Sequence, residues 1–342
     1  MRYLMVSTYP PTHCGIGAYG EQSVAQLRGQ GHVVDVLSPD GRGNVDFAWD
    51  LRGGSKILRL LELAPCYDKI VIQYHPSFFY TDFFQAQSRR DTFRTTLSFL
   101  LLFLRCRKVE VVAHEVPNVT GRQRRWYGWK WKLAPSLVLH TQAERERLEK
   151  HYGIRPGSRR VQLREHHAVF QKFSSAHTQT SARQQLGLDR NRLVFLCIGF
   201  VQRHKGFDRA IQAFVQARLR DAQLYIVGSL RPDDPPELRF SKYLAELHAL
   251  ASQHRNVHVL ESFVSKEDFD TWITAADWTI FPYLATSSSG VLARTRLLQR
   301  PAIISAVGGL PNQAAERDLL FTTDEELVNI LQLAAMATDR AI

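Results

Sequence analysis

The stretch RYLMVSTYPPTHCGIGAYGEQSVAQLRGQGHVVDVL, residues 2–37, contains the features that decide the fold. It opens with a short apolar run, passes through a proline-containing loop into a helix-like segment, and ends in a second strand-like run. Gly15, Gly17 and Gly20 follow the spacing G-x-G-x-x-G, which in nucleotide-binding proteins brings bare backbone and a helix N-terminus close to phosphate. The stretch therefore predicts a strand–helix–strand unit beside an anionic ligand.

The glycine spacing alone is also compatible with an NAD(P)-dependent oxidoreductase. In a dinucleotide-binding unit the first glycine follows the strand directly, and an acidic residue about 20 positions further on holds the ribose. Asp35 and Asp40 satisfy the second condition. However, the segment TYPPTHC separates the strand from Gly15, and its two prolines predict a rigid excursion instead of a tight turn. The oxidoreductase interpretation stays open, but this loop disfavours it.

Outward from this stretch, strand-like and helix-like runs alternate along the chain. Such alternation is typical of parallel sheets with helices on both faces. The polar, serine-rich segment from Val169 to Gln185 interrupts it, and the alternation then restarts. We expect an α/β protein with Rossmann-like domains over 1–170 and 186–342 and a linker over 171–185. The expected strands are RYLMVS (2–7), HVVDVL (32–37), KIVIQY (69–74), VEVVAH (109–114), SLVLH (136–140), RLVFLCIG (192–199), AQLYIVG (222–228), NVHVL (256–260), DWTIF (277–281) and PAIISA (301–306).

The composition of the 342-residue chain fits globular domains, with 44% hydrophobic and 23% charged residues. Its four cysteines form no C-x-x-C pair, so we expect neither a disulfide framework nor a zinc knuckle. The first apolar run is too short for a secretory signal, and no segment approaches the about 20 apolar residues of a membrane span. These features predict a cytoplasmic protein.

The net charge of +11 is concentrated in the N-terminal half. Residues 1–170 hold 25 Lys and Arg against 15 Asp and Glu, and residues 89–132 alone carry a charge of +8. In that segment cations follow the apolar run LSFLLLFL (97–104), and GRQRRWYGWKWKL (121–133) interleaves tryptophans with Arg and Lys. Such stretches suit the headgroup level of an anionic membrane, here its inner face. Two alternatives stay open: nucleic acid, for which no binding module is recognisable, and an ordinary buried helix with solvated cations.

The second half contains IGFVQRHKGFDRAIQAF (198–214), AADWTIFP (275–282) and PAIISAVGGLP (301–311). Together with YPPTHCGIGAYGEQSVAQLRGQGHVVDVLS (9–38), these motifs resemble the family 4 retaining glycosyltransferases of the GT-B fold. The resemblance spans nearly the whole chain. It implies two Rossmann-like domains facing each other across a cleft, the first binding an acceptor and the second a nucleotide-diphosphate sugar. It also implies a retaining, hexosyltransferase-type reaction without a metal, and an acceptor that is a cell-envelope glycan or a lipid-linked one.

The resemblance assigns roles to particular residues. Arg203 and Lys205 stand where cations would stabilise the diphosphate leaving group, which makes them catalytic and donor-binding candidates. His114 matches the family's histidine beside the reacting sugar, and His75 and Glu115 are acceptor-side candidates. Solvated loop cations and a structural histidine remain the alternatives. A glycine loop and a serine-rich loop at a helix N-terminus are expected to bind the donor. Their candidate residues are Gly15, Gly17, Thr286, Ser287, Ser288, Ser289, Gly290, Val291 and Arg294.

The donor loop departs from the family pattern. Family members carry two glutamates separated by seven residues, one binding sugar hydroxyls and the other the ribose, and these positions fall at Thr286 and Arg294. If the chain is an enzyme, its serine-glycine loop must bind the donor mainly through the diphosphate. The missing carboxylates also keep open a non-catalytic, glycosyltransferase-like binding subunit.

His166 and His167 are adjacent and lie near the predicted linker. Successive side chains of an extended segment point to opposite sides, so both cannot face one metal ion. We therefore expect neither histidine to be a metal ligand.

Overall fold

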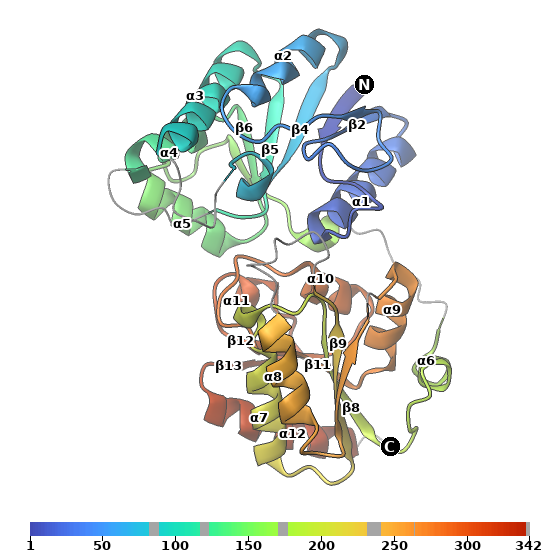
Figure 1. The fold of residues 1–342 in the computed structure, drawn as a ribbon. Helices are drawn as coiled ribbons and strands as arrows, with labels where there is room; N and C mark the ends of the chain where they lie inside the picture. The colour runs from blue at the N-terminus through green and yellow to red at the C-terminus, as the bar shows by residue number, and fades with distance from the viewer. Residues whose placement is uncertain (82–88, 117–122, 170–176, 231–240, 263, 340–342) are drawn as a thin grey trace. The chain divides into compact units, whose positions relative to one another are not determined.

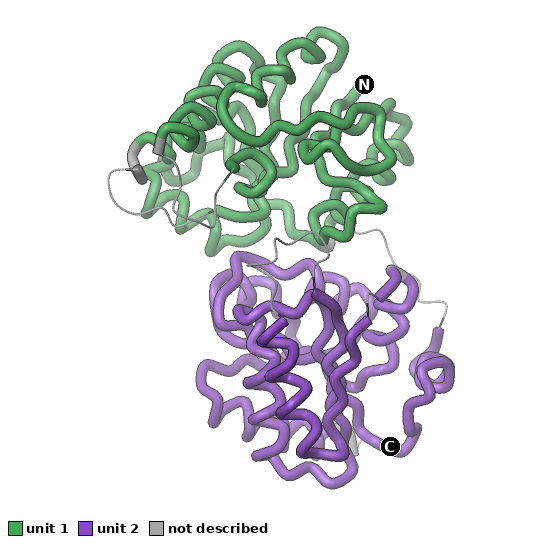
Figure 2. Tube along the Cα trace, viewed as in Figure 1, with its two compact units in different colours: residues 1–171 green, residues 172–342 purple. Residues whose placement is uncertain are grey.

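The computed structural model describes residues 1–81, 89–116, 123–169, 177–230, 241–262 and 264–339. The chain forms two compact units, residues 1–171 and residues 172–342 (Figure 2). Within each unit helices and strands alternate along the chain, as Figure 1 shows. No helix in the described part of the chain is long and apolar enough to cross a bilayer.

The described residues of unit 1 contain a seven-stranded sheet in the order β3-β2-β1-β4-β5-β6-β7, with every pairing parallel. The strand order reverses at β1, and open α/β sheets bind ligands at such a point, outside the carboxyl ends of the strands. The strands are β1 (Arg2–Val6), β2 (Val33–Ser38), β3 (Phe47–Ala48), β4 (Lys69–Tyr74), β5 (Val109–Ala113), β6 (Ser136–Leu139) and β7 (Val161–Leu163).

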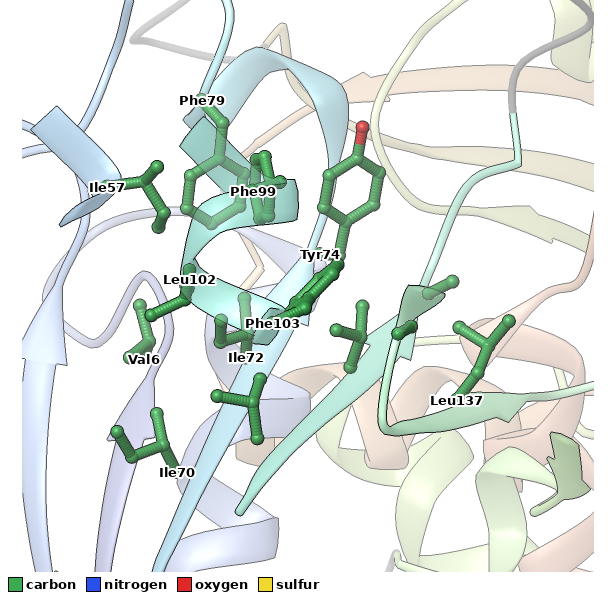
Figure 3. Packing of buried hydrophobic residues seen from close by; sticks show 14 of the residues in the cluster. Val6, Ile57, Ile70, Ile72, Tyr74, Phe79, Phe99, Leu102, Phe103 and Leu137 are labelled. Carbon is green, nitrogen blue, oxygen red and sulfur yellow. The ribbon is translucent and has the colours of Figure 1, made fainter. Parts of the chain in front are cut away.

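Helices cover both faces of this sheet. They are α1 (Gly15–Gly29), α2 (Leu60–Leu63), α3 (Arg89–Arg105), α4 (Gln123–Leu133) and α5 (Gln142–Tyr152), with 3-10 turns η1 (Lys56–Arg59), η2 (Ala64–Cys66), η3 (Pro76–Phe78) and η4 (His166–Ala168). Ile70 and Ile72 of β4 belong to the core that contains Phe99 of α3 (Figure 3). Val71, between them, belongs to a second core that contains Tyr19 of α1. Successive strand residues thus serve opposite faces, which is why most residues of these strands are apolar.

The described residues of unit 2 contain a six-stranded sheet in the order β10-β9-β8-β11-β12-β13, again with parallel pairings. Its order reverses at β8, so the ends of β8 and β11 border the expected crevice. The strands are β8 (Leu193–Ile198), β9 (Ala222–Gly228), β10 (Val257–Glu261), β11 (Trp278–Phe281), β12 (Ala302–Ser305) and β13 (Leu319–Phe321).

The helices of unit 2 also cover both faces of their sheet. They are α6 (Gln179–Gln185), α7 (Phe207–Ala217), α8 (Ser241–Ala251), α9 (Lys266–Ala275), α10 (Gly290–Leu297), α11 (Leu310–Gln313) and α12 (Asp324–Asp339). A 3-10 turn, η5 (Arg203–Lys205), lies between β8 and α7. Phe214 of α7 and Leu327 of α12 share one core with Phe195 of β8. Ala182 of α6 and Ile273 of α9 belong to another core, together with the residues of β8 that alternate with Phe195.

Local sequence signals explain where several helices begin and end. Thr141 and Glu144 form a capping box at α5, and Gly153 ends that helix with φ 63°. The hydroxyls of Ser265 and Ser289 cap α9 and α10 by accepting hydrogen bonds from the N–H groups of Asp268 and Leu292. These short polar motifs are local signals that mark the helix boundaries.

The predicted α/β fold is confirmed, and each of the ten predicted strands is present with ends that differ by at most one residue. Sequence inspection missed β3, β7 and β13, whose two or three residues are too few to show a pattern. Residues 179–185 of the predicted linker form α6. Its Arg183 forms a buried ion pair with Asp277 and donates to the carbonyl of Ala275 at 2.9 Å. This polar helix therefore packs as part of unit 2.

Candidate functional site

The loop after β8 lies at the carboxyl end of that strand, where the strand order of unit 2 reverses. Gly199 follows the strand with φ 123°, a backbone conformation that residues with side chains rarely adopt. A Cβ on Gly228, at the end of β9, would lie 2.0 Å from the carbonyl oxygen of Gly199. A Cβ on Gly199 would lie 2.8 Å from Lys205 Nζ. The ammonium group of Lys205 therefore lies in the space that the missing side chain leaves beside the end of β8.

Lys205 ends the turn η5, and only 9% of its surface is exposed. Its Nζ lies 6.0 Å from the ring centroid of Phe207 and 5.8 Å from that of Tyr283. Gly206 has φ 61°, and a Cβ there would lie 2.2 Å from the carbonyl oxygen of Pro282, just after β11. Only glycine lets the turn approach β11 this closely. The K-G sequence thus holds a primary amine at the adjoining ends of β8 and β11.

Arg203, the second predicted cation, contacts a different partner. Its Nη2 lies 2.6 Å and 2.8 Å from the two carboxylate oxygens of Glu246 on α8, and its guanidinium lies 4.9 Å from the ring centroid of Tyr243. The Arg203 and Glu246 side chains are 56% and 51% exposed. An exposed ion pair contributes about 0–1 kcal/mol. Little free energy therefore holds Arg203 against Glu246.

Ser289 fixes the start of α10. Its hydroxyl accepts a hydrogen bond from the N–H of Leu292 at 3.2 Å. Its own N–H donates to Gln313 Oε1 at 2.7 Å, and its carbonyl accepts from Gln313 Nε2 at 3.1 Å. Gln313 belongs to α11, so this reciprocal pair ties the serine-rich loop to the PAIISAVGGLP segment that ends in that helix.

The first turn of α10 lies near the end of β8. A Cβ on Gly199 would be 3.7 Å from the side chain of Val291, the second residue of α10. Thr286 Oγ1 donates to the carbonyl of Ser288 at 2.7 Å, which folds the loop back on itself. Thr286, Ser287, Ser288 and Gly290 are all partly exposed. A helix N-terminus with accessible hydroxyl groups therefore lies beside Gly199 and is available to an anion.

Arg294 contacts α9 through its guanidinium. It forms an ion pair with Asp270 and lies 4.9 Å from the ring centroid of Phe269. Both side chains are mostly buried, with 14% of Arg294 and 15% of Asp270 exposed. This contact explains how a cation is accommodated at a position where the resemblance calls for a glutamate.

In unit 1, the predicted glycine loop continues directly into α1. The helix begins at Gly15, which has open space around it, and a Cβ on Gly17 would lie 3.3 Å from the carbonyl oxygen of Thr8. A Cβ on Gly20 would lie 2.3 Å from the hydroxyl of Ser7. Two of the three glycines thus allow α1 to pack against the loop after β1, which accounts for the spacing without any ligand.

The two acceptor-side candidates contact each other at the ends of β4 and β5. His75 Nε2 lies 2.8 Å from a carboxylate oxygen of Glu115. The other ring nitrogen, Nδ1, lies 2.6 Å from the hydroxyl of Ser77. The structure therefore brings this imidazole and carboxylate together as a hydrogen-bonded pair.

His114 follows β5 and lies among other rings. Its Nε2 lies 2.7 Å from Gln73 Oε1, and Gln73 Nε2 donates to the sulfur of Met5 at 3.3 Å. Its ring centroid lies 4.9 Å from Tyr19 and 4.9 Å from His140. Burial lowers the pKa of His114 well below its usual range, with a smaller contribution from His140. The imidazole is therefore neutral at pH 7.

Sequence inspection missed His140, although the sequence contains a signal for it. His75, His114 and His140 each follow directly on a strand, and those strands, β4, β5 and β6, are neighbours in the sheet. The carboxyl ends of adjacent parallel strands meet at one edge. Burial lowers the pKa of His140 to about 4.

The basic segment over 89–132 does not form one continuous exposed surface. Lys130 is 1% exposed, and its Nζ lies 3.5 Å from the ring centroid of Tyr127 and 3.0 Å from the hydroxyl of Tyr80. Burial lowers the pKa of Lys130 well below its usual range. The expectation that Lys130 reaches a membrane is therefore wrong, because its stem and amine lie inside an aromatic cluster. Residues 117–122 and the side chains of Arg89, Arg124 and Arg125 lie outside the described part.

The helices α3 and α4 are nevertheless amphipathic. Phe99 and Trp131 face the core of unit 1. Large apolar side chains on the same two helices are 37–54% exposed, and exposed cations accompany them. The apolar residues are Phe93, Leu97, Leu104, Trp129 and Leu133, and the cations are Arg90, Arg94, Arg105, Arg107, Lys108 and Lys132. We call this set the α3–α4 surface.

Comparison with known proteins identifies the architecture. Residues 192–335 match the family model of the glycosyl transferases group 1. No curated protein sequence matches the chain. Among solved structures, sucrose-phosphate synthase from Thermosynechococcus elongatus is similar, with a TM-score of 0.71, 16% identity and coverage of 98% of this chain and 90% of that one. The chain has the GT-B fold.

Two further GT-B structures extend the comparison. HepE from Anabaena, solved in complex with UDP-glucose, has a TM-score of 0.66 at 16% identity, covering 99% of this chain and 91% of HepE. WaaG, a glycosyltransferase involved in lipopolysaccharide biosynthesis, has a TM-score of 0.64 at 18% identity, covering 98% and 90%. These structures share the fold of this chain, and residues 192–335 are similar to the glycosyl transferases group 1.

Proposed function

We propose that this protein is a glycosyltransferase that moves a sugar from a nucleotide-diphosphate sugar to an acceptor glycan. The observation that carries the proposal lies in unit 2, within the segment that matches the glycosyl transferases group 1. There Lys205 and the N-terminus of α10 adjoin Gly199 at the end of β8. HepE, whose fold this chain shares, was solved with UDP-glucose.

The chemistry of the reaction suits these groups. When the sugar leaves its nucleotide, negative charge develops on the departing diphosphate, and a fixed ammonium group and the positive end of a helix dipole stabilise that charge without reorganising. We assign this role to Lys205 and to the loop Thr286–Ser289 with Gly290 and Val291. Arg203 would exchange Glu246 for a phosphate oxygen, at a cost of about 0–1 kcal/mol for an exposed pair.

The donor loop favours recognition through phosphate. Arg294 is engaged with Asp270, and Thr286 offers a hydroxyl where the resemblance calls for a carboxylate. Backbone N–H groups and hydroxyls of the loop favour anions over sugar or ribose hydroxyls. We therefore propose that a free nucleoside diphosphate binds nearly as well as the intact donor, and that the nucleoside alone binds poorly.

We place the acceptor and the reacting sugar beside unit 1. His114 is neutral and keeps Nδ1 as a lone-pair nitrogen if Nε2–H donates to Gln73, which suits a polar contact to a sugar hydroxyl. The His75–Glu115 pair would orient an acceptor hydroxyl. Retention of configuration, a hexose as the transferred sugar and catalysis without a metal are part of this proposal, carried over from the family resemblance.

The α3–α4 surface supports a lipid-linked acceptor in polysaccharide or glycolipid synthesis. Exposed aromatic and aliphatic side chains among cations are suited to the headgroup level of an anionic membrane. We propose peripheral binding to the inner membrane face from the cytoplasm, and the four free cysteines are compatible with that compartment.

The missing glutamates at Thr286 and Arg294 favour a second candidate, a glycosyltransferase-like subunit that binds without catalysing transfer. A thermal-shift panel separates the candidates, because a ligand that binds only the folded state raises the melting temperature. The panel contains UDP-, ADP- and GDP-sugars, the free diphosphates, the nucleosides and NAD(P). A shift with a nucleotide sugar followed by release of its diphosphate supports the enzyme. A rise in melting temperature without turnover favours the non-catalytic subunit. A rise with NAD(P) alone would overturn both the enzyme and the subunit.

Membrane binding is tested by sedimentation with neutral and acidic liposomes at several salt concentrations. We expect binding to acidic liposomes only, weakening as salt screens the attraction. Trp129→Ser should reduce binding, whereas Leu333→Ser, at a residue 59% exposed on α12, should not. Equal failure to sediment at low salt with both liposomes would contradict the membrane proposal, and binding to RNA or DNA instead would favour the nucleic-acid alternative.

A further inference from the structure

Three histidines from different parts of unit 1 meet at one edge of its sheet. His114 follows β5, His140 follows β6, and His166 opens the turn η4 after β7. The ring centroids of His140 and His166 are 3.8 Å apart, and that of His114 lies 4.9 Å and 6.0 Å from them. One ring nitrogen from each lies within 4.8 Å of the other two.

The hydrogen bonds of His140 define the state of its ring. Nδ1 lies 2.9 Å from the carbonyl oxygen of Arg164, which can only accept, so Nδ1 carries the proton. Nε2 therefore bears a lone pair. This nitrogen is buried and has no hydrogen-bond partner among the described residues. A buried acceptor without a partner costs about 1–3 kcal/mol, so the ring is held in place by its surroundings at a free-energy cost.

His114 is oriented in a similar manner. Gln73 donates through Nε2 to the sulfur of Met5, which leaves Gln73 Oε1 to accept from His114 Nε2–H at 2.7 Å. The lone pair of His114 is then on Nδ1. Histidines that bind metals usually donate their other ring N–H to a carbonyl or carboxylate oxygen, which fixes the tautomer and the ring direction. His114 and His140 both show this arrangement.

From this geometry we infer that His114, His140 and His166 form a binding site for one divalent transition-metal ion of the zinc class. Three neutral imidazoles suit Zn²⁺, Co²⁺ or Ni²⁺, whereas Mg²⁺ and Ca²⁺ require oxygen ligands. Tetrahedral zinc with Zn–N of about 2.0–2.1 Å places its nitrogens about 3.4 Å apart. The rings must therefore close from separations of up to 4.8 Å, a movement within reach of small side-chain rotations.

The structure changes the expectation for His166. The sequence argument assumed an extended chain, but residues 166–168 form the 3-10 turn η4. His166 turns into the unit and is 7% exposed. The site lies wholly within unit 1, so it does not depend on the proposed transferase reaction. If both proposals hold, they share His114, and metal binding should lower transferase activity.

The test uses the tag-free, chelator-treated full chain and the metal ions alone. Calorimetry should give one Zn²⁺ per chain and no binding of Mg²⁺. Co²⁺ should produce the visible absorption of tetrahedral nitrogen ligation. His140→Ala and His166→Ala should each weaken Zn²⁺ binding at least tenfold, while His248→Ala, at an exposed residue of α8, should bind as the wild type does.

A second measurement needs no variant and guards against misfolding of the alanine proteins. X-ray absorption of the zinc-loaded wild type should show imidazole scattering from three ligands at about 2.0–2.1 Å. Three results would each overturn the proposal. They are absence of 1:1 zinc binding, zinc ligation without imidazole, and folded His140→Ala and His166→Ala proteins that bind zinc as the wild type does.

Discussion

The proposal for unit 2 makes its sharpest prediction at Lys205. Lys205→Met keeps an apolar stem against Phe207 and Tyr283 but removes the ammonium group beside Gly199. A preorganised donor at developing charge contributes about 2–4 kcal/mol to the transition state. At about 1.36 kcal/mol for each factor of ten, kcat/KM should fall about 30- to 900-fold.

The assay measures release of the nucleoside diphosphate from the donor identified in the thermal-shift panel. Lys242→Met is the matched control, because Lys242 is an exposed lysine on α8 and should keep wild-type kinetics. Arg203→Ala should show a smaller loss than Lys205→Met, since its guanidinium must first leave Glu246. Lys205 does not bind the diphosphate if the Lys205→Met protein melts as the wild type does and retains the wild-type kcat/KM and affinity for the diphosphate.

Three further predictions concern the framework of the two units. Gly228→Ala should destabilise unit 2 by about 1–3 kcal/mol in urea unfolding, because the added Cβ would lie 2.0 Å from the carbonyl oxygen of Gly199. The control Gly29→Ala should not destabilise the protein, because no atom lies within 4 Å of the added Cβ. A double-mutant cycle of Arg294→Gln and Asp270→Asn should give a coupling free energy of about 0.5–3 kcal/mol. The Arg294→Glu protein should bind the diphosphate no better than the wild type, because the new carboxylate faces the carboxylate of Asp270. In metal-free protein, His140 takes up a proton below about pH 6.5 when the chain is unfolded but only near pH 4 when it is folded. Lowering the pH through this window should therefore reduce the free energy of unfolding by about 3 kcal/mol. His140→Gln should flatten this pH dependence of the urea midpoint, and an unchanged dependence would contradict the assignment.

Much of the fold was predictable from local patterns. Ten strands follow from mainly apolar runs of five to eight residues, because strands of a parallel sheet bury side chains on both faces. The short strands β3, β7 and β13 and the polar helix α6 were not predicted. Their positions depend on pairing or packing with distant segments, such as the ion pair of Arg183 with Asp277.

The sequence by itself determined the two α/β units and the serine cap of α10. These features depend on local periodicity, backbone conformation and capping, which neighbouring residues set. Tertiary structure alone decided that Lys130 lies in the core, that Arg203 contacts Glu246, and that His140 and His166 join His114. Those outcomes depend on which strand ends are adjacent and on which partners lie within reach across the fold. Contacts between residues 26 to 52 positions apart leave no periodic trace in the chain, so only the folded structure could reveal them.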